Sequence, residues 1–264
     1  MNLEFYKYQG TGNDFIIVDN RSELFPKKDT KINSKISKLC ERHFGIGADG
    51  LILLEKCKGY DFNMVYYNSD GREGTMCGNG GRCTVDLAKY LKIFERETTF
   101  LGFDGVHHAS VEVDNKIKLQ MKNVQEVKKR DGFFLDTGSP HYVVMVDDIY
   151  NYPVKEKGRI IAHLEPYGKK GTNVNFVEQN GNNSFFVRTY ERGVEDETLS
   201  CGTGVVASAI SMFHAQQTKS KNINIITRGG HLNISFKIDN NGGYHSIFLK
   251  GAVEKVYQGH LFGF

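Results

Sequence analysis

Two of the five cysteines stand at the start of the same short motif, Cys-Gly-X-Gly. Cys77 begins Cys-Gly-Asn-Gly, Cys201 begins Cys-Gly-Thr-Gly, and an apolar periodicity typical of a helix follows each motif. The first N–H groups of a helix lack internal partners, and the helix dipole is positive there. Such an end favours a thiolate and also holds a carboxylate. The sequence therefore predicts two activated thiols, each beside a carboxylate-binding turn.

A pair of thiols on opposite faces of one carbon can invert a stereocentre that bears a hydrogen. The thiolate removes the proton, and the opposite thiol delivers a proton to the other face. The α-hydrogen of an amino acid is a very weak acid, so its removal requires a neutralised carboxylate and the exclusion of water. We therefore expect Cys77 and Cys201 to be an acid/base pair. No lysine is marked as a Schiff-base partner for pyridoxal phosphate, although the sequence does not exclude one.

The two motifs belong to an internal duplication of about half the chain. Four segments recur in the same order at a spacing of about 125 residues: 11–19 and 137–147, 50–55 and 173–178, 64–68 and 187–191, and 77–80 and 201–204. Two chance glycine turns would not also preserve the order of the strands between them. The sequence therefore predicts two equivalent halves that meet near residue 120.

The elements around the motifs follow from apolar spacing and turn residues. Helices are expected over 33–44, 81–94 and 203–215. Strands are expected over 15–18, 51–54, 62–67, 142–146, 175–177, 185–190, 223–227, 232–238, 244–249 and 253–257. Many strands are joined by short turns, so the prediction is an α/β (α+β) fold with a mixed, largely antiparallel sheet in each half.

Composition narrows the function further. The chain has 34 basic and 31 acidic residues and a net charge of +3. A surplus this small does not indicate a basic surface that binds nucleic acid or an anionic membrane. No apolar run approaches the roughly 20 residues of a membrane span, and the N-terminus carries no secretory pattern. An odd number of cysteines indicates a reducing compartment, so we expect a cytoplasmic protein whose partner is a small molecule.

In its motifs and their order the chain resembles the diaminopimelate epimerase family. The resemblance runs from Gly10-Thr11-Gly12-Asn13-Asp14-Phe15 to Gly251-Ala252-Val253. Its most specific parts are 77–83, Cys-Gly-Asn-Gly-Gly-Arg-Cys, and Tyr190-Glu191-Arg192-Gly193 ahead of the second cysteine motif. It implies two pseudo-symmetric halves, each wrapped around a central helix, with the active site in the cleft between them and a homodimeric assembly. By the family pattern the first half is 1–120 completed by the C-terminal strand 252–264, and the second is 121–251.

The resemblance also implies a function and its residues. The family interconverts LL- and meso-diaminopimelate in lysine and peptidoglycan precursor biosynthesis, with no cofactor and no metal. Cys77 and Cys201 would be catalytic, and His141 and Glu191 would tune the pKa of the thiols. The substrate would contact Asn13, Asn68, Gly78, Asn79, Asn173, Glu191, Arg192, Gly202 and Thr203.

Three departures from the family pattern affect substrate recognition. Gly50 stands where the family often has Gln, and Ser139 stands where it often has Asn. The segment 193–200 is one residue longer and more acidic than the commonest form.

Two other functions stay open. The first is a racemase or epimerase of another amino acid of the proline or hydroxyproline type, although Glu191, Arg192 and the asparagines favour a substrate with two charged ends. The second is a non-catalytic thiol switch in which Cys77 and Cys201 form a reversible disulfide. Cys40, Cys57 and Cys83 are expected to be structural, and the absence of a Cys-X-X-Cys pair argues against zinc.

Overall fold

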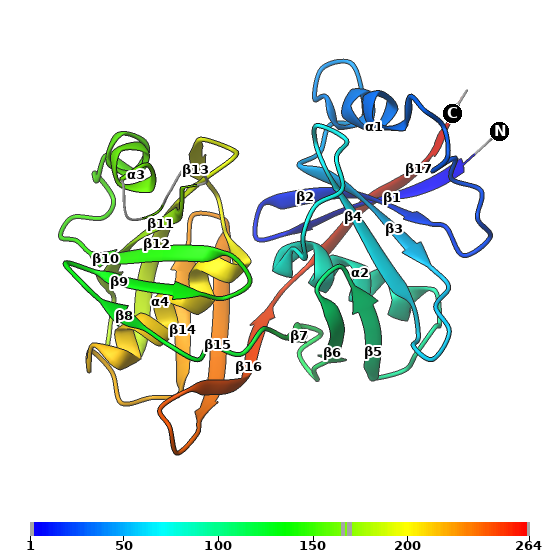
Figure 1. The fold of residues 1–264 in the computed structure, drawn as a ribbon. Coiled ribbons are helices and arrows are strands. Elements are labelled where there is room, and N and C mark those ends of the chain that lie inside the picture. The colour runs from blue at the N-terminus through cyan, green and yellow to red at the C-terminus, as the bar shows by residue number, and fades with distance from the viewer. Residues whose placement is uncertain (1–2, 165–166, 168–170, 263–264) are drawn as a thin grey trace. The chain divides into compact units, whose positions relative to one another are not determined.

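The computed structural model describes residues 3–164, 167 and 171–262 of the chain. The chain folds into two units (Figure 1). The first unit is Met1–Leu119 with Ala252–Phe264, and the second is Gln120–Gly251. Residues 1–2 and 263–264, at the ends of the predicted first half, lie outside the described residues.

The first unit surrounds helix α2 (Gly78–Tyr90) with strands and carries helix α1 (Ile32–Cys40). Its strands are β1 (Leu3–Gly10), β2 (Asn13–Asp19), β3 (Gly50–Glu55), β4 (Asn63–Asn68), β5 (Glu97–Gly102), β6 (Gly105–Val111), β7 (Ile117–Gln120) and β17 (Glu254–Leu261). β1 pairs antiparallel with both β2 and β17, so the last strand of the chain lies beside the first.

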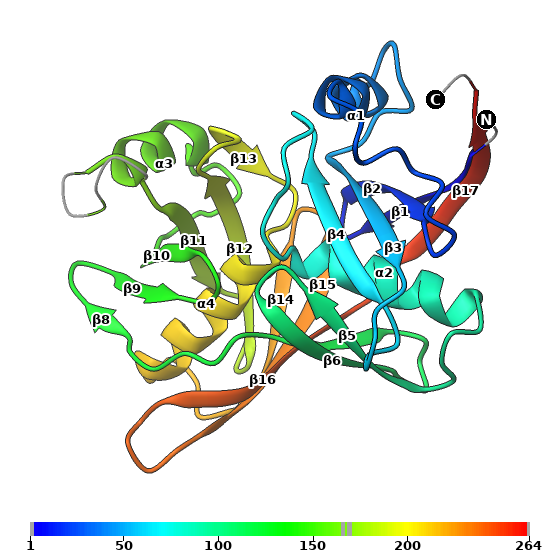
Figure 2. The same cartoon turned by 45° about the vertical axis from the view of Figure 1, so that its right-hand side comes forward.

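The second unit surrounds helix α4 (Gly202–His214) and carries α3 (Val154–Ala162) (Figure 2). Its strands are β8 (Lys128–Lys129), β9 (Phe133–Asp136), β10 (Pro140–Met145), β11 (Asn173–Gln179), β12 (Ser184–Glu191), β13 (Asp196–Thr198), β14 (Asn222–Thr227), β15 (Gly230–Ile238) and β16 (Tyr244–Gly251). β9 pairs antiparallel with β10, as β1 does with β2 in the first unit.

The two units repeat one order of strand pairings. Along β2-β3-β4-β5-β6-β7 the pairs are parallel, antiparallel, parallel, antiparallel and antiparallel. Along β10-β11-β12-β14-β15-β16 the pairs follow the same sequence of directions. The predicted fold class, two pseudo-symmetric halves with mixed sheets around a central helix, is therefore confirmed.

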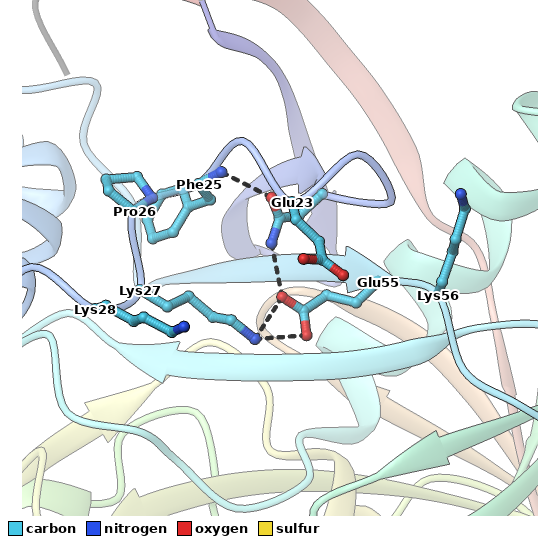
Figure 3. Close-up of a pocket in the computed structure, with 8 residues that line it drawn as sticks. Glu23, Phe25, Pro26, Lys27, Lys28, Glu55 and Lys56 are labelled. Carbon is cyan, nitrogen blue, oxygen red and sulfur yellow. Dashed lines mark hydrogen bonds and ion pairs between the residues drawn. The ribbon is translucent and has the colours of Figure 1, made fainter.

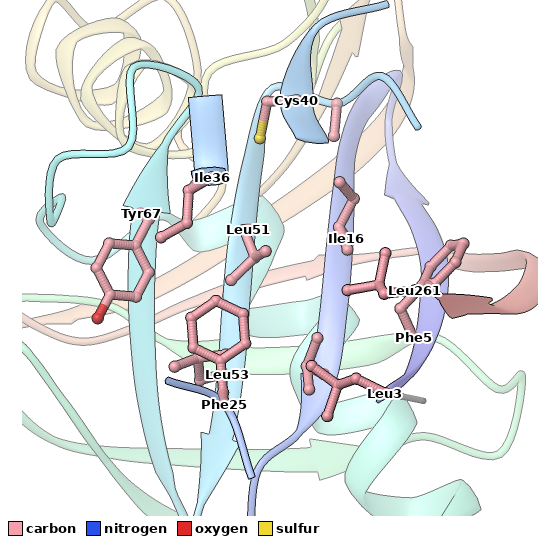
Figure 4. Packing of buried hydrophobic residues seen from close by; sticks show 12 residues of the cluster. Leu3, Phe5, Ile16, Phe25, Ile36, Cys40, Leu51, Leu53, Tyr67 and Leu261 are labelled. Atoms are coloured by element: carbon pink, nitrogen blue, oxygen red, sulfur yellow. The ribbon is translucent and has the colours of Figure 1, made fainter. Parts of the chain in front are cut away.

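Strands β2 and β3 are apolar at consecutive positions because both of their faces are covered. Ile16 and Leu51 belong to a buried cluster that includes Ile36 and Cys40 of α1 (Figure 4). On the other face, a Cβ on Gly80 of α2 would lie 3.0 Å from Ile52 Cδ1. Parallel strands buried on both faces lose the polar alternation of half-buried strands. The central helices are correspondingly buried, with ten residues of α2 and ten of α4 inaccessible.

All three predicted helices have other boundaries than the sequence predicted. α1 ends at Cys40 rather than at residue 44, because Glu41 is extended and the N–H groups of Ile46 and Gly47 turn back to the Leu39 carbonyl. Phe44 is consequently 83% exposed. α2 begins at Gly78 and ends at Tyr90 instead of spanning 81–94, and α4 begins one residue earlier than expected.

The sequence analysis missed helix α3 and the strands β1, β5, β6, β7, β8, β9 and β13. Gly158 lies in the middle of α3, and a Cβ there would be 2.4 Å from Tyr190 Cβ. Glycine disfavours helix in isolation by about 1 kcal/mol, so this helix depends on its close packing against β12.

Candidate active site

Both motif cysteines are the N-cap residues of the central helices. Cys77 precedes α2 with φ −108° and ψ 118°, and Cys201 precedes α4 with φ −116° and ψ 115°. The Cys77 carbonyl accepts a hydrogen bond from the N–H of Gly81 at 2.7 Å, and the Cys201 carbonyl accepts one from Val205 at 3.0 Å. The two thiols thus have the same backbone setting at the positive end of a helix, as the sequence predicted.

In the first unit, Asn13 orients the polar groups around Cys77. Its Nδ2 donates to Asp49 Oδ2 at 2.7 Å, which leaves its Oδ1 facing Cys77 Sγ at 3.6 Å and Asn79 Nδ2 at 3.3 Å. Burial, reinforced by the charge of Asp14, raises the pKa of Asp49. Asn13, Cys77 and Asn79 therefore form one cluster. Asp49 fixes the orientation of the Asn13 amide within it.

Asp14 anchors this cluster to the surrounding strands. Its carboxylate pairs with Lys7 at 2.7 Å and Arg42 at 2.8 Å. Burial alone would raise the pKa of Asp14, but the hydrogen bonds from Arg42 and Lys7 lower it to about 2. The charge beside Asp49 is consequently permanent at neutral pH.

Asn68 and Gly50 lie opposite each other at the ends of β4 and β3. A Cβ on Gly50 would lie 2.5 Å from Tyr66 Cε2 and 2.5 Å from the Tyr67 carbonyl oxygen, so no larger side chain fits there. The ring of Tyr66 occupies the space next to this position. Residue 50 is therefore glycine where the family often has glutamine, and the ring of Tyr66 fills the space that a side chain at residue 50 would enter.

In the second unit, strand pairing brings His141 beside two asparagines. β10 and β11 are parallel, with His141 opposite Asn173 and Val143 opposite Asn175. Residues two apart in a strand share a face, so both amides point toward the histidine. Asn175 Nδ2 lies 3.0 Å from His141 Nδ1, and Asn173 Nδ2 lies 3.3 Å from His141 Nε2.

The hydrogen bonds of Asn175 fix the tautomer of His141. Asn175 Nδ2 also donates to the Tyr142 carbonyl at 3.3 Å, and its Oδ1 accepts from Thr189 Oγ1 at 3.0 Å. The amide therefore presents N–H to His141 Nδ1, which must be an acceptor. Complete burial lowers the pKa of His141 to about 3, so the ring is neutral and carries its proton on Nε2. The 3.3 Å approach of Asn173 Nδ2 to Nε2 is then a contact between two donors, and Asn173 Nδ2 donates to Ser139 Oγ instead.

The proton on His141 Nε2 is directed at Thr203, and Thr203 contacts Cys201. Nε2 lies 2.9 Å from Thr203 Oγ1, which lies 3.4 Å from Cys201 Sγ. Thr137 Oγ1 donates to the Thr203 carbonyl at 2.9 Å and holds this turn in place. A three-residue chain thus connects a neutral histidine to the second thiol.

Glu191 is the last residue of strand β12, and Arg192 follows it, next to this chain. The Arg192 N–H donates to Asn173 Oδ1 at 3.1 Å, and its Nη2 lies 3.4 Å from Ser139 Oγ. Ser139 also accepts from Asn173 Nδ2 at 3.1 Å, so the shorter side chain at this position is still used. Glu191 Oε1 accepts from Thr198 Oγ1 at 2.6 Å.

The longer segment 193–200 forms part of the second unit's framework. It contains β13, which pairs antiparallel with β12 and places Glu197 opposite Tyr190. Because Thr198 of β13 binds the Glu191 carboxylate, this segment positions one predicted substrate contact.

Sequence reasoning missed Asn175, Thr137, Asp49 and Arg82. Asn175 was detectable because it follows Asn173 at the two-residue period of a strand. Arg82 follows Asn79 by three residues, which is close to one helical turn, and its Nη1 donates to Asn79 Oδ1 at 3.0 Å. Asp49 and Thr137 come close to the site only through folding.

Other features of the described residues carry less chemistry. The pocket of Figure 3 lies in the first unit among Asn20, Phe25, Lys27 and Glu55. The side chains of Asn20 and Lys27 bind the Glu55 carboxylate, and Asn20 Oδ1 accepts from the Phe25 backbone N–H. Cys40 and Cys83 are buried, and burial raises the pKa of both thiols. Within the described residues, no cluster of three or more His, Cys, Asp or Glu side chains is arranged to hold a metal. No helix in the described ranges is long and apolar enough to cross a membrane.

Comparison with known proteins identifies the family. A sequence profile described as diaminopimelate epimerase matches residues 5–93 and 133–256. The chain belongs to the diaminopimelate epimerase family. The diaminopimelate epimerase of Flavobacterium psychrophilum is 54% identical over 97% of this chain and 99% of its own length. That of Aquifex aeolicus is 40% identical over 98% of both chains. The family and the epimerase class expected from the sequence are thereby confirmed.

Solved structures of other proteins share the fold of this diaminopimelate epimerase family member. A PhzF-family phenazine biosynthesis protein from Bacillus anthracis matches with a TM-score of 0.78 at 14% identity, over 99% of both chains. A probable proline racemase from Agrobacterium radiobacter matches with a TM-score of 0.71 at 14% identity, over 99% of this chain and 93% of that one. At these identities the likeness concerns the fold alone.

Proposed function

We propose that the protein interconverts LL- and meso-diaminopimelate by moving the α-proton between Cys77 and Cys201, without a cofactor. The observation that carries this proposal is the equivalent N-cap position of the two thiols in two duplicated units. Two acid/base groups of one chemical type suit a reaction that must run in both directions. The names of the relatives support the substrate.

The reaction needs one thiolate and one thiol at the start of each turnover. The thiolate sulfur removes the α-hydrogen as a proton, and the electron pair of the C–H bond stays on the substrate. The opposite S–H then gives its proton to the other face of that carbon and becomes the thiolate. The pair ends in the reverse protonation state, ready for the opposite isomer.

The charge that develops in this reaction is delocalised into the substrate carboxylate. Gly78 and Asn79 begin α2, and Gly202 and Thr203 begin α4. We expect the N–H groups of these four residues to bind such a carboxylate. Exclusion of water around the bound substrate strengthens each of these hydrogen bonds. This arrangement supplies the stabilisation that the weakly acidic α-hydrogen requires.

Recognition of the distal end distinguishes diaminopimelate from smaller amino acids. Arg192 suits a carboxylate, and Glu191 suits an ammonium group. Asn13, Asn68 and Asn173 add amide contacts for a substrate charged at both ends. A racemase of the proline type, the alternative function, would have no use for this second set of charges. His141 and Glu191 act on the protonation of the thiols.

The cellular setting follows from the proposed reaction. Its product enters lysine and peptidoglycan precursor synthesis, which places the protein in the cytoplasm. We expect a homodimer, which sedimentation at micromolar concentration would detect.

Proton NMR of LL-diaminopimelate in deuterated water, with purified protein and no added pyridoxal phosphate, tests the proposal. The expected result is loss of the α-proton signal together with formation of the meso isomer. Activity on proline with none on diaminopimelate would replace the proposal by the alternative. Mass spectrometry under reducing and mildly oxidising conditions tests the thiol switch, and a Cys77–Cys201 disulfide in a protein that is inactive after reduction would favour it.

A further inference from the structure

Arg82 is a completely buried arginine in the second turn of α2, five residues after Cys77. Its Nη1 donates to Asn79 Oδ1 at 3.0 Å and lies 3.5 Å from the Gly78 carbonyl, and its Nη2 lies 3.5 Å from Thr11 Oγ1. All of these partners are neutral. Among the described residues no carboxylate forms an ion pair with Arg82, and its buried Nε has no hydrogen-bond partner.

A buried guanidinium without a counter-charge is costly, because burial strips it of water. Its position makes the cost larger, since the positive end of the α2 dipole lies on the same side. Burial accordingly lowers the pKa of Arg82, while nearby Cys83 and Cys77 act in the opposite direction. Burial raises the pKa of Cys83, so Cys83 is a neutral thiol and Cys77 is the group able to supply a negative charge.

The second unit lacks this charge at the equivalent helix position. Counting from each N-cap cysteine, Arg82 corresponds to Val206, which is fully buried and apolar. Cys201 instead contacts Thr203. The Thr203 hydroxyl accepts a hydrogen bond from Nε2–H of the neutral His141 ring. The duplicated halves are therefore electrostatically unequal directly behind their thiols.

We infer that Arg82 is the buried counter-charge of the Cys77 thiolate, and that the absence of such a charge at Val206 leaves Cys201 as the protonated thiol of the resting protein. The role of this charge in catalysis rests on the proposed function, whereas the ionisation of the two thiols does not. Arg82 acts through Cys77 and does not contact the reacting carbon. For the isomer whose α-hydrogen faces Cys77, the resting protein then needs no prior proton transfer.

Other charged and titratable groups act on both thiols. Asn13 Oδ1 accepts from the Cys77 thiol over a long 3.6 Å contact, and Asp49 lies behind Asn13, so both favour the protonated form. Asp86 lies one turn beyond Arg82 and binds Tyr8 at 3.2 Å. Near Cys201 the groups are His141, Arg192, Glu191 and the exposed Asp136. A full buried charge has a larger effect on a thiolate than a long neutral hydrogen bond has. We therefore expect Arg82 to make the Cys77 thiol ionise at a lower pH than the Cys201 thiol.

The test measures the rate of iodoacetamide alkylation of each thiol against pH, resolved by peptide mass spectrometry and without substrate. Cys201→Ser isolates Cys77, and Cys77→Ser isolates Cys201, so the two titrations are not coupled. The midpoint for Cys77 is expected to be at least about one pH unit below that for Cys201. A single buried charge within the first two turns of the helix changes a thiol midpoint by about this amount.

Arg82→Met and Arg82→Lys then separate charge from structure. In the Cys201→Ser background, Arg82→Met should raise the Cys77 midpoint by about one to two pH units, and Arg82→Lys should retain most of the wild-type value. Cys201 in the Cys77→Ser, Arg82→Met protein should keep its midpoint. Equal or reversed midpoints for the two thiols would overturn the inference, and so would an unchanged Cys77 midpoint in folded Arg82→Met. The comparison of the two single-cysteine variants decides the question even if Arg82→Met does not fold. Because the experiment measures thiol ionisation, its result for the inference does not depend on whether the protein is active on diaminopimelate.

Discussion

Asn175 donates its Nδ2 hydrogen to Nδ1 of His141 over 3.0 Å and thereby decides which nitrogen of the ring carries the proton. The same amide group donates to the Tyr142 carbonyl, so it cannot turn over without losing two bonds. The consequence reaches Cys201, because the other ring nitrogen faces Thr203 at 2.9 Å and Thr203 faces the thiol. Asn175 therefore orients the polar chain behind the second thiol.

Replacement of Asn175 by Asp tests this relationship. A carboxylate only accepts, so His141 must place a proton on Nδ1. The ring then either gives up its Nε2 proton and its bond to Thr203 or becomes an imidazolium paired with the new carboxylate, and the polar chain behind Cys201 is altered in both cases. We expect a loss of at least about tenfold in kcat. The ¹⁵N spectrum of histidine-labelled protein should show the change of tautomer or of protonation, with His141→Gln used to assign the signal. Thr189→Val, which removes the other partner of Asn175, is the matched control and should leave the tautomer as it is. An unchanged ring signal in Asn175→Asp would contradict the assignment.

Gly204 and Gly80 occupy the same position in the two central helices and provide a matched pair of substitutions. A Cβ on Gly204 would lie 2.3 Å from Asn175 Oδ1, which cannot withdraw without releasing Thr189 and His141. A Cβ on Gly80 would lie 3.0 Å from Ile52 Cδ1, the end of a flexible side chain. Gly204→Ala should lower the free energy of unfolding by about 1–3 kcal/mol and reduce activity, whereas Gly80→Ala should change stability by less than about 1 kcal/mol. Urea denaturation and initial rates of both variants measure the difference, and equal effects would show that the Asn175 contact is not the cause.

The stability of the protein should depend on pH through His141. The pKa of this histidine is about 3 in the fold against 6.5 in an unfolded chain, so the unfolded state takes up the proton first as the pH falls. The contribution to stability is fully present above pH 6.5 and is lost progressively between pH 6.5 and 3. Its slope is at most about 1.4 kcal/mol per pH unit.

Urea denaturation of wild type and His141→Gln at several pH values from 7.5 to 4.5 isolates this effect from other titrating groups. The difference in unfolding free energy between the two proteins should shrink as the pH falls. Parallel curves over this range would show that His141 is not buried as a neutral ring.

Cys77→Ala and Cys201→Ala should each abolish interconversion, because one thiol alone cannot both remove and return the proton on opposite faces. A reduction of at least about 10³-fold in kcat is expected, with circular dichroism unchanged. Cys57→Ala is the control, since this half-buried cysteine lies outside both clusters and should retain activity. Full activity in either of the first two variants would remove that thiol from the mechanism.

The sequence was sufficient to predict the elements whose signals are local. Glycine after each motif cysteine and the apolar stripes that follow predicted two helices with the thiols at their starts, and the structure confirms both. The order of the repeated segments predicted two equivalent sheets. By contrast, the end of α1 was predicted four residues too late, because the chain turns after Cys40 and the carbonyls of Leu39 and Cys40 accept from N–H groups of residues 46–48. That competition depends on where the next strand begins, which no helical periodicity contains.

What the sequence determined by itself is the pair of thiols, their helix N-caps, the duplication and the family. These are properties of spacing and residue type along the chain. Only the tertiary structure decided that His141 is neutral with its proton on Nε2, that Tyr66 fills the space beside Gly50, and that Arg82 is buried with no carboxylate partner in the described part of the chain. Each of these depends on which side chains meet across strands and on how completely water is excluded. Burial and partner geometry set the protonation of a group, and neither is encoded in the residue type of that group alone.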